Sequence, residues 1–413
     1  MDARFLGIDD IARTLNLNSR SRMQAFYDTV LAGQETVGLD IEGFDWADIQ
    51  LDSDVEFAEF KDSLKGMATY VDGDSEPIAR GRQVEISKLT ASIPTQRRKI
   101  VRGKNDYKKL LLAASKAETM GRLVGKTPNN SVFDFLVNNL FDTLKDIPES
   151  HNASISYQVG QMKSKRGLTL TSDNNNGGLK DVTFSAQVPE GNVDKTAWYK
   201  KSKSSGAITY IDTVDPILTL KKKVRSLKLD HYQGYQSVTV EMNAFTFFTL
   251  MEHPKVLAKI GYSLRPELNA SPKNDENATR VGSDAYFSKG DDFAKEWFKN
   301  AIGADAVIIN TTVVGADKLN LSTKQIDTAK LDVFEDGVIL VRPSGIIGSI
   351  YPVMVVRPDD SAIYANIFGG RGIIEYMYNK DTREQKWISE LSVLAVPTMP
   401  KKMFYFEIQS LIS

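Results

Sequence analysis

The sequence contains no cysteine and only three histidines in 413 residues. The absence of cysteine excludes disulfides, thiolate nucleophiles and cysteine-based metal sites. None of the histidines, His151, His231 and His253, has a second histidine or a carboxylate at the spacing that places two metal ligands on one helix face. His253 precedes Pro254 at a break between expected helices, so we expect a structural or surface role for it. The sequence predicts no metal and no cofactor.

Short catalytic motifs are also missing. The chain has no Gly-x4-Gly-Lys-Ser/Thr phosphate loop and no Gly-x-Ser-x-Gly nucleophile elbow. The Gly-Gly-Arg-Gly stretch at 369–372 leads into an expected strand, whereas a dinucleotide loop needs a helix there, so a tight turn is expected. Residues 173–178 begin like a calcium loop, but Gly177 stands at a ligand position and Phe184 where a bidentate glutamate is required. We therefore predict that the protein is not an enzyme.

Long apolar runs and a strong net charge are absent as well. The longest apolar stretches, such as 345–356, are too short to span a membrane, and no secretory signal follows Met1. The net charge of −1 gives no general attraction to nucleic acid or acidic membranes. The basic runs 163–166 and 221–223 lack interleaved aromatics and are weak nucleic-acid signals. A globular composition and a length of 413 residues predict two or more substructures.

Charge is sorted along the first quarter of the chain. In residues 35–76, the acidic strip, the only cations are Lys61 and Lys65. In residues 80–109, the basic strip, the only acids are Glu85 and Asp106. Adjacent strips of opposite charge stabilise each other, either as a hairpin within one molecule or between copies. The alternative is two solvated faces of an ordinary domain.

Strand and helix patterns alternate in blocks along the chain. Strands are expected at 67–71 and 84–89, and a helix at 106–123. A second helix is expected from an N-cap at Ser131, because Phe133, Leu136, Val137, Leu140, Phe141 and Leu144 form one apolar stripe. Strands are expected next at 155–159, 168–170 and 182–186.

The second half begins with helices and ends with strands. Asp215 and Pro216 predict a helix start, and Asn243 caps a helix that is interrupted near 253–254. Residues 264–290 are polar and predict a long surface loop, after which Asp291 caps a short helix. The remaining expected strands are 306–314, 337–341, 350–356, 373–378, 387–396 and 403–408. Grouped helices and strands predict an α+β fold.

Several segments together resemble the tailed-phage major capsid fold (Hong Kong 97-like), most closely the lambda-type head protein family. Residues 67–101, with Pro94 and the sequence Gln-Arg-Arg-Lys at 96–99, resemble that family's extended loop. Residues 107–123 resemble the long spine helix, and 210–216 the start of the axial domain. Residues 366–372, 387–391 and 396–397 resemble the family's closing strands. The likeness therefore covers almost the whole chain.

The resemblance implies a domain organisation and a function. The implied parts are an N-terminal arm (1–64), an extended loop or β-hairpin (65–104), a peripheral domain with the spine helix (105–204), an axial domain (205–385) and return strands to the peripheral domain (386–413). The implied protein self-assembles through hexamers and pentamers into an icosahedral shell around double-stranded DNA. It is assembled in the host bacterial cytoplasm and located in the virion. Portal, scaffolding and decoration proteins are further expected partners, with weak non-specific contact to packaged DNA and no membrane.

The same resemblance gives the charged strips a role, because the family's extended loop lies over a neighbouring subunit. The expected intersubunit residues are Arg80, Arg82, Lys88, Arg97, Arg98, Lys99 and Arg102 in the basic strip and Asp52, Asp54 and Glu56 in the acidic strip. We further expect no proteolytic removal of a leading domain and no covalent crosslinking. The alternatives are a non-viral nanocompartment shell, a tail-sheath-like assembly protein and, last, an enzyme with an unfamiliar site.

Overall fold

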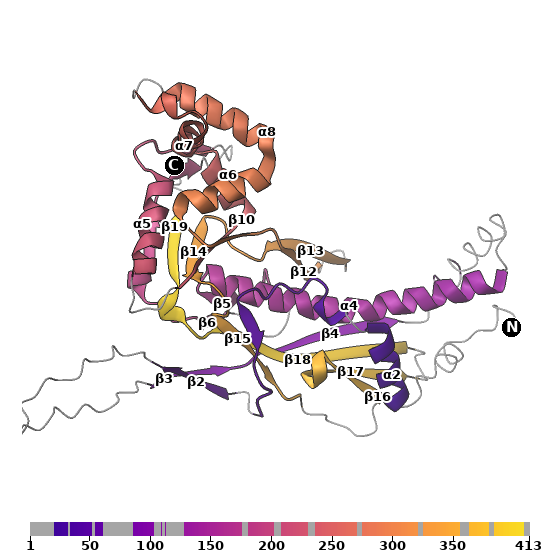
Figure 1. Ribbon diagram of the computed structural model, residues 1–413. Helices are drawn as coiled ribbons and strands as arrows, with labels where there is room; N and C mark the ends of the chain where they lie inside the picture. Colours follow the sequence, from indigo (N-terminus) through magenta and orange to yellow (C-terminus); the bar gives the residue numbers. More distant parts are fainter. Residues whose placement is uncertain are drawn as a thin grey trace, which may run out of the picture.

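The chain folds as an α+β protein, which confirms the predicted class (Figure 1). The computed structural model describes residues 20–31, 34–51, 54–60, 86–102, 109, 112, 128–175, 181–201, 208–229, 236–270, 275–320, 325–355, 363–379 and 384–408. The predicted strand at 67–71 and nearly all of the predicted helix at 106–123 lie outside these residues. Within the described part of the chain, no helix is both long and apolar enough to cross a membrane.

The larger sheet has six strands and is centred on β18 (Glu384–Pro397). β17 (Gly372–Asn379) and β4 (Thr95–Arg102) pair antiparallel with the first part of β18, one on each side, and β15 (Gly348–Val353) pairs antiparallel with its last residues. β16 (Ile363–Ile367) extends the sheet beyond β17, and β1 (Phe44–Trp46) pairs parallel with β15. Segments about 300 residues apart in sequence are thus joined in one sheet, and their pairing cannot be read from local signals.

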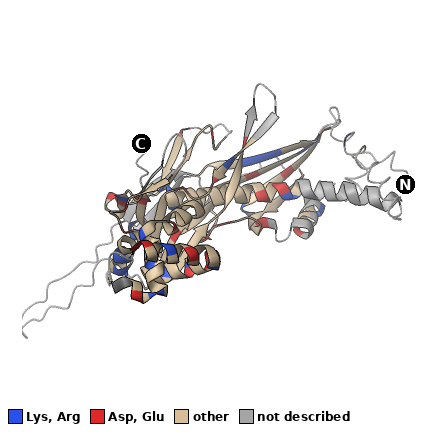
Figure 2. Ribbon diagram, turned by 90° about the horizontal axis from the view of Figure 1, so that it is seen from above, with Lys and Arg blue, Asp and Glu red and all other residues tan. Residues whose placement is uncertain are grey.

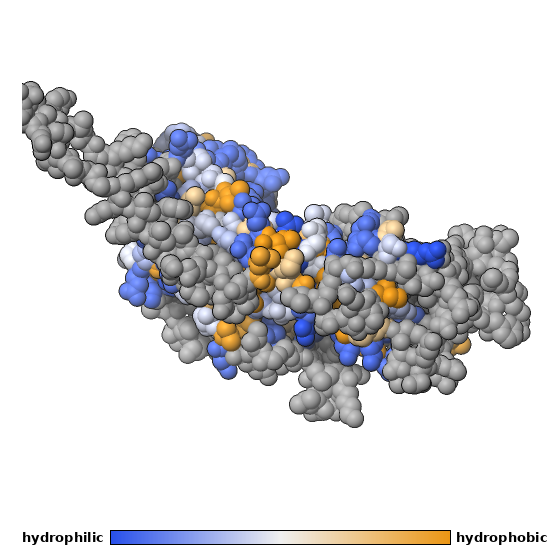
Figure 3. Space-filling view, turned by 90° about the horizontal axis from the view of Figure 1, so that it is seen from below, coloured by the Kyte–Doolittle hydropathy of each residue, from blue (hydrophilic) through white to orange (hydrophobic). Residues whose placement is uncertain are grey.

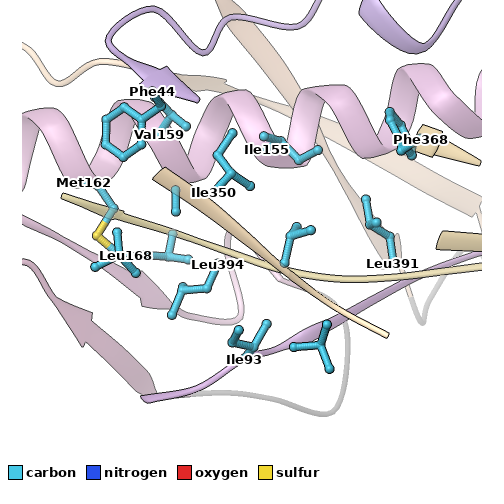
Figure 4. Packing of buried hydrophobic residues seen from close by; sticks show 14 of the residues in the cluster. Phe44, Ile93, Ile155, Val159, Met162, Leu168, Ile350, Phe368, Leu391 and Leu394 are labelled. Carbon is cyan, nitrogen blue, oxygen red and sulfur yellow. The ribbon is translucent and has the colours of Figure 1, made fainter. Parts of the chain in front are cut away.

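One helix of 37 residues, α4 (Pro128–Ser164), lies along this sheet. Ile147, Ile155 and Val159 are fully buried and pack with Ile350 and Leu394 in the first hydrophobic core (Figure 4). The predicted strand at 155–159 is therefore wrong, because this segment is helical. Isoleucine and valine lower the helix preference of this segment, but every residue of 155–164 except Tyr157 is buried inside the molecule, and this tertiary burial outweighs the local preference.

The smaller sheet has five strands in the order β11-β10-β14-β19-β7. These are β11 (Ala306–Asn310), β10 (Val238–Asn243), β14 (Val338–Pro343), β19 (Phe404–Ile408) and β7 (Val193–Thr196). The helices α5 (Pro216–Leu229), α6 (Ala244–Met251), α7 (Pro254–Leu264) and α8 (Asp275–Ile302) pack around it and form the second core. The helix starts predicted from Pro216 and Asn243 are confirmed, since the Asn243 side chain accepts a hydrogen bond from the Thr246 N–H at 2.9 Å.

The surface loop predicted at 264–290 is wrong, because most of this segment belongs to α8. The helix bends at Gly290, where φ is 79°, and the short helix predicted from Asp291 is its second part. Gly261 of α7 and Gly282 of α8 allow the two backbones to touch, since a Cβ on either residue would collide with a carbonyl of the other helix. Small residues at a helix crossing look like loop residues in sequence, which explains the error.

Several two-stranded ladders complete the fold. They are β2 (Asp54–Phe60) with β3 (Ile86–Ser92), β5 (Gly167–Leu170) with β6 (Val182–Ser185), β8 (Tyr199–Lys201) with β9 (Ile208–Tyr210), and β12 (Val313–Asn320) with β13 (Gln325–Asp332). Short helix α2 (Arg20–Leu31) packs on β16. The tight turn predicted at 369–372 is confirmed, because Gly369 and Gly370 connect β16 to β17 with φ of 64° and 89°.

The two sheets draw on segments from both sides of the expected domain boundaries. β15, β16 and β17 fall within 205–385 and join the six-stranded sheet. β7 falls within 105–204 and β19 within 386–413, and both join the five-stranded sheet. Sheet membership depends on long-range pairing, whereas the expected boundaries are contiguous.

Candidate assembly surfaces

One part of each strip lies in the β2–β3 ladder, where β2 carries Asp54, Glu56 and Glu59 and β3 carries Lys88. The antiparallel register places Glu56 opposite Thr90 and Lys88 opposite Ala58. The two strands pair by their backbones, but no acid of β2 stands directly opposite a cation of β3, so the expected contact between copies stays a prediction. Arg80, Arg82 and Asp52 lie outside the described residues.

Arg97 lies on β4 within the six-stranded sheet and directly opposite Glu390 of β18. Its Nε and one terminal nitrogen both lie 2.7 Å from Glu390 Oε2. The Arg97 side chain is 68% exposed, so the pair is a surface ion pair of about 0.2–1 kcal/mol.

Arg98 joins β4 to two other elements of its own chain. One terminal nitrogen donates to Asp317 Oδ2 of β12 at 2.7 Å, and the other to Asp146 Oδ2 of α4 at 3.1 Å. The hydrogen bond from Arg98 lowers the pKa of Asp317, and the hydrogen bond from the Thr328 hydroxyl lowers it further, so that it stays below its usual value although burial acts in the opposite direction. Arg98 thus ties the β12–β13 ladder to the sheet and to α4.

Lys99 and Arg102 complete the cations on β4, which Figure 2 colours blue along the sheet. Lys99 is exposed and forms no ion pair with any described residue. The backbone of Arg102 pairs with Gln385. Among the expected interface residues with described side chains, Arg97 and Arg98 are bound to acids of their own chain, and Lys99 is the cation left available to another molecule.

A hollow of 820 Å³ opens beside β4, between α4, β5 and β12. His151 lies at its wall, with Nε2 2.9 Å from Ser389 Oγ and Nδ1 3.4 Å from Gln96 Oε1. Burial, and then the charge of Arg98, lowers the pKa of His151 to about 4, so the imidazole is neutral near pH 7. A neutral histidine between an amide and a buried serine lacks the carboxylate that orients a catalytic base, which indicates a structural role.

The hollow's His151–Ser389 pair was not found from the sequence, because the two residues are 238 positions apart. Among the described residues, no group of three or more histidines or carboxylates could hold a metal ion. The predicted structural role of His253 agrees with its geometry, since Nδ1 accepts from the Lys255 N–H at 3.2 Å at the start of α7.

Exposed apolar side chains gather where the N-terminal segment meets β15. Ile49, Leu51 and Met354 are 39%, 85% and 53% exposed, and the backbone joins them through the Met354 N–H to the Gln50 carbonyl at 2.8 Å. Viewed from below, the described surface shows several such apolar groups separated by polar residues (Figure 3). These groups are a second kind of surface available to another molecule.

Comparison with known proteins returns similarity in structure only. No family model matches the chain, and no curated protein matches it by sequence. A chain from the satellite phage P4 procapsid, solved with its size-determination protein, is 10% identical, with 92% of this chain and 98% of that chain covered and a TM-score of 0.44. A putative capsid protein of a prophage from E. coli CFT073 is 10% identical, covering 95% and 99%, with a TM-score of 0.43. A virus-like particle protein from Pyrococcus furiosus is 8% identical, covering 92% and 96%, with a TM-score of 0.35.

Proposed function

We propose that the chain is a major capsid protein of the tailed-phage type with a Hong Kong 97-like fold. It self-assembles through hexamers and pentamers into an icosahedral shell that encloses double-stranded DNA. Portal, scaffolding and decoration proteins are its further partners, and the assembled protein is located in the virion. The resemblance stated from the sequence is the first support for this proposal.

The observation that carries the proposal is the β2–β3 ladder. In the described part of the chain these strands pair only with each other, and the ladder stands at the edge of the body in Figure 1. An isolated two-stranded ladder is at best marginally stable in water, because it buries little apolar surface. A ladder of this kind gains stability by lying on another surface, and a neighbouring subunit in a shell supplies one.

The body of the molecule supports the same proposal. The six-stranded sheet with α4 corresponds to a peripheral domain, and the five-stranded sheet with α5 to α8 to an axial domain. The N-terminal segment bridges them: β1 pairs with β15, while Asp40 Oδ2 accepts from Asn310 Nδ2 at 3.0 Å and from the Thr312 hydroxyl at 3.1 Å. An arm that lies across two domains is suited to hold them in one orientation during assembly.

Removal of the ladder tests the proposal. Asp54 and Ser92 are cross-strand partners, so residues 55–91 can be replaced by an Asn-Gly turn without moving the body. We expect the parent chain, expressed with its scaffold, to form closed shells in negative-stain images, and the shortened chain to stay folded by circular dichroism and form none. Shells from the shortened chain would contradict the role of the ladder.

The contents and shape of the particles formed by the unaltered parent chain distinguish the alternatives. Closed shells that contain DNA support a capsid, shells that contain only protein cargo indicate a nanocompartment, and open tubes indicate a sheath-like protein. A monodisperse monomer in every condition, with scaffold present, overturns the proposal.

A further inference from the structure

The outer face of α5 carries a stripe of cations between two leucines. The stripe follows helical spacing and consists of Leu218, Lys221, Lys222, Arg225 and Leu229, all exposed. The opposite face, with Ile217, Leu220, Val224 and Leu227, is buried in the second core. Residues 216–229 contain no acid, so no charge on α5 itself neutralises the stripe.

The other cations of α5 are already engaged. Lys223 Nζ lies 3.6 Å from the centroid of the Phe404 ring, and Lys228 Nζ lies 2.8 Å from Asp305 Oδ2. Lys221, Lys222 and Arg225 form no ion pair with any described residue. The stripe is therefore a surface with three available positive charges and two exposed leucines, at 44% and 60%.

Phe287 on α8 stands on a face that carries exposed charges of both signs, with the cation Arg280 seven residues before it. Phe287 is 71% exposed and is the only exposed aromatic residue among the described side chains. Asp284, also exposed, lies three residues earlier on the same helix face. The Phe287 ring is 5.0 Å from that of Tyr286, and Asp291, which is also exposed, follows Phe287 by four residues, directly after the bend at Gly290.

The two surfaces lie on different sides of the helical part of the molecule. In Figure 1, α5 stands on the left of this part and the bend of α8 on its right. They cannot meet within one chain in this arrangement, so a contact between them joins two copies by different patches. Such a head-to-tail contact repeats from copy to copy and closes into a ring when its rotation allows.

We propose that Phe287 of one copy, flanked by Asp284 and Asp291, docks on the Leu218–Leu229 stripe of α5 in the next copy. The aromatic ring lies against exposed leucine, and the carboxylates face Lys221, Lys222 and Arg225. The contact rests on the proposed function, in which it is a ring contact between axial domains. The charges set the orientation of the two copies and the apolar groups supply the buried area.

Charge exchange tests the contact. Reversal of the stripe charges (Lys221→Glu, Lys222→Glu, Arg225→Glu) and reversal of the two carboxylates beside Phe287 (Asp284→Lys, Asp291→Lys) should each lower the yield of rings and shells at least tenfold at low salt. The chain that carries both sets presents exchanged charges at every contact, so its yield should return to within about threefold of the parent. Yields are measured by sedimentation and negative-stain imaging.

Three further variants separate the possible causes. Glu267→Lys with Glu276→Lys reverses two exposed carboxylates of the same domain and should assemble like the parent. Phe287→Ala should stay folded and lose assembly at both 0.1 M and 1 M salt. The stripe variant should regain part of its yield at 1 M, where the Debye length is about 3 Å.

The inference is overturned if the chain with both sets of reversals assembles no better than the variant with one set that assembles less. It is also overturned if Phe287→Ala assembles normally. Those results, with shells from the parent chain, leave the proposed function standing. Failure of the parent chain to form any assembly overturns the proposed function instead.

Discussion

Lys163 Nζ lies 2.5 Å from Glu241 Oε1, and both side chains are buried, with 1% and 0% exposure. The pair joins the end of α4, over the six-stranded sheet, to β10 of the five-stranded sheet. Arg342 Nε donates to the other oxygen of Glu241 at 3.1 Å, and Lys163 also donates to the Glu42 carbonyl at 3.1 Å. A single carboxylate thus balances two buried cations where the arm and both sheets meet.

Replacement of that carboxylate should destabilise the subunit strongly. In Glu241→Gln, Lys163 and Arg342 remain buried without an anion, and loss of one member of a buried ion pair costs about 3–5 kcal/mol. Urea unfolding of the unassembled subunit measures the change. Lys165→Met is the matched control, because Lys165 is 49% exposed and its pair with Glu335 should be worth under about 1 kcal/mol. Similar losses in the two variants would contradict the role of the buried cluster.

His151 should make the subunit less stable in acid. Its pKa is about 4 in the folded chain, against 6.5 for an unperturbed histidine, so the unfolded chain binds the proton first as pH falls. The stability that His151 contributes is therefore complete above pH 6.5 and is lost as pH falls to about 4, by roughly 3 kcal/mol in total.

The comparison with His151→Gln isolates this effect, since glutamine keeps a hydrogen-bonding group beside Ser389 and does not titrate. The difference in unfolding free energy between the two proteins, measured from pH 7 to pH 4, should shift by that amount in favour of the variant. A difference that stays constant with pH would show that His151 is not buried in its neutral form.

Arg98 and Lys99 are neighbours on β4 and should respond differently to charge reversal. Arg98→Glu places a carboxylate beside Asp317 and Asp146 and should cost the subunit at least about 1 kcal/mol. Lys99→Glu meets no acid partner among the described residues and should cost under about 0.5 kcal/mol. Thermal unfolding of the unassembled subunit compares them.

If the basic strip contacts a neighbouring copy, assembly should fall in Lys99→Glu although the subunit is intact, and 1 M salt should restore part of it. Normal assembly of Lys99→Glu at low salt would show that this part of the strip is a solvated face. Reversal of 97–99 together is a poorer test, because Arg97 and Arg98 hold acids of their own chain.

The crossing of α7 and α8 should not tolerate a methyl group. A Cβ at residue 282 would collide with the Leu257 carbonyl, so Gly282→Ala should cost about 1–3 kcal/mol by forcing the helices apart. This occurs although alanine favours a helix by about 1 kcal/mol over glycine. Gly191→Ala is the control, because nothing lies within 4 Å of a Cβ there. Circular dichroism during urea unfolding should separate the two variants, and equal stabilities would contradict close backbone packing.

Local chemistry in the sequence was enough to predict several elements of this protein. Asp215 with Pro216, and Asn243 at the start of α6, specify helix starts through short-range hydrogen bonds, which any surrounding structure preserves. Most strands of the last third were predicted from apolar runs. In the structure some of these runs are buried in the six-stranded sheet and others in the five-stranded sheet. The sorted charges were also visible in the sequence, and the structure places acids of the first strip on β2 and most described cations of the second strip on β4.

Tertiary structure decided what depends on distant partners. Residues 155–159 resemble a strand but are helical because this part of α4 is buried on nearly all sides, with Ile155 and Val159 in the first core. Residues 275–289 resemble a loop but are helical because small side chains let α8 approach α7. The partners of Arg98, His151 and Lys163 lie 48 to 238 positions away. Such contacts form only when long loops close, and the entropy of closure is overcome by burial of the whole core, which no short segment of sequence encodes.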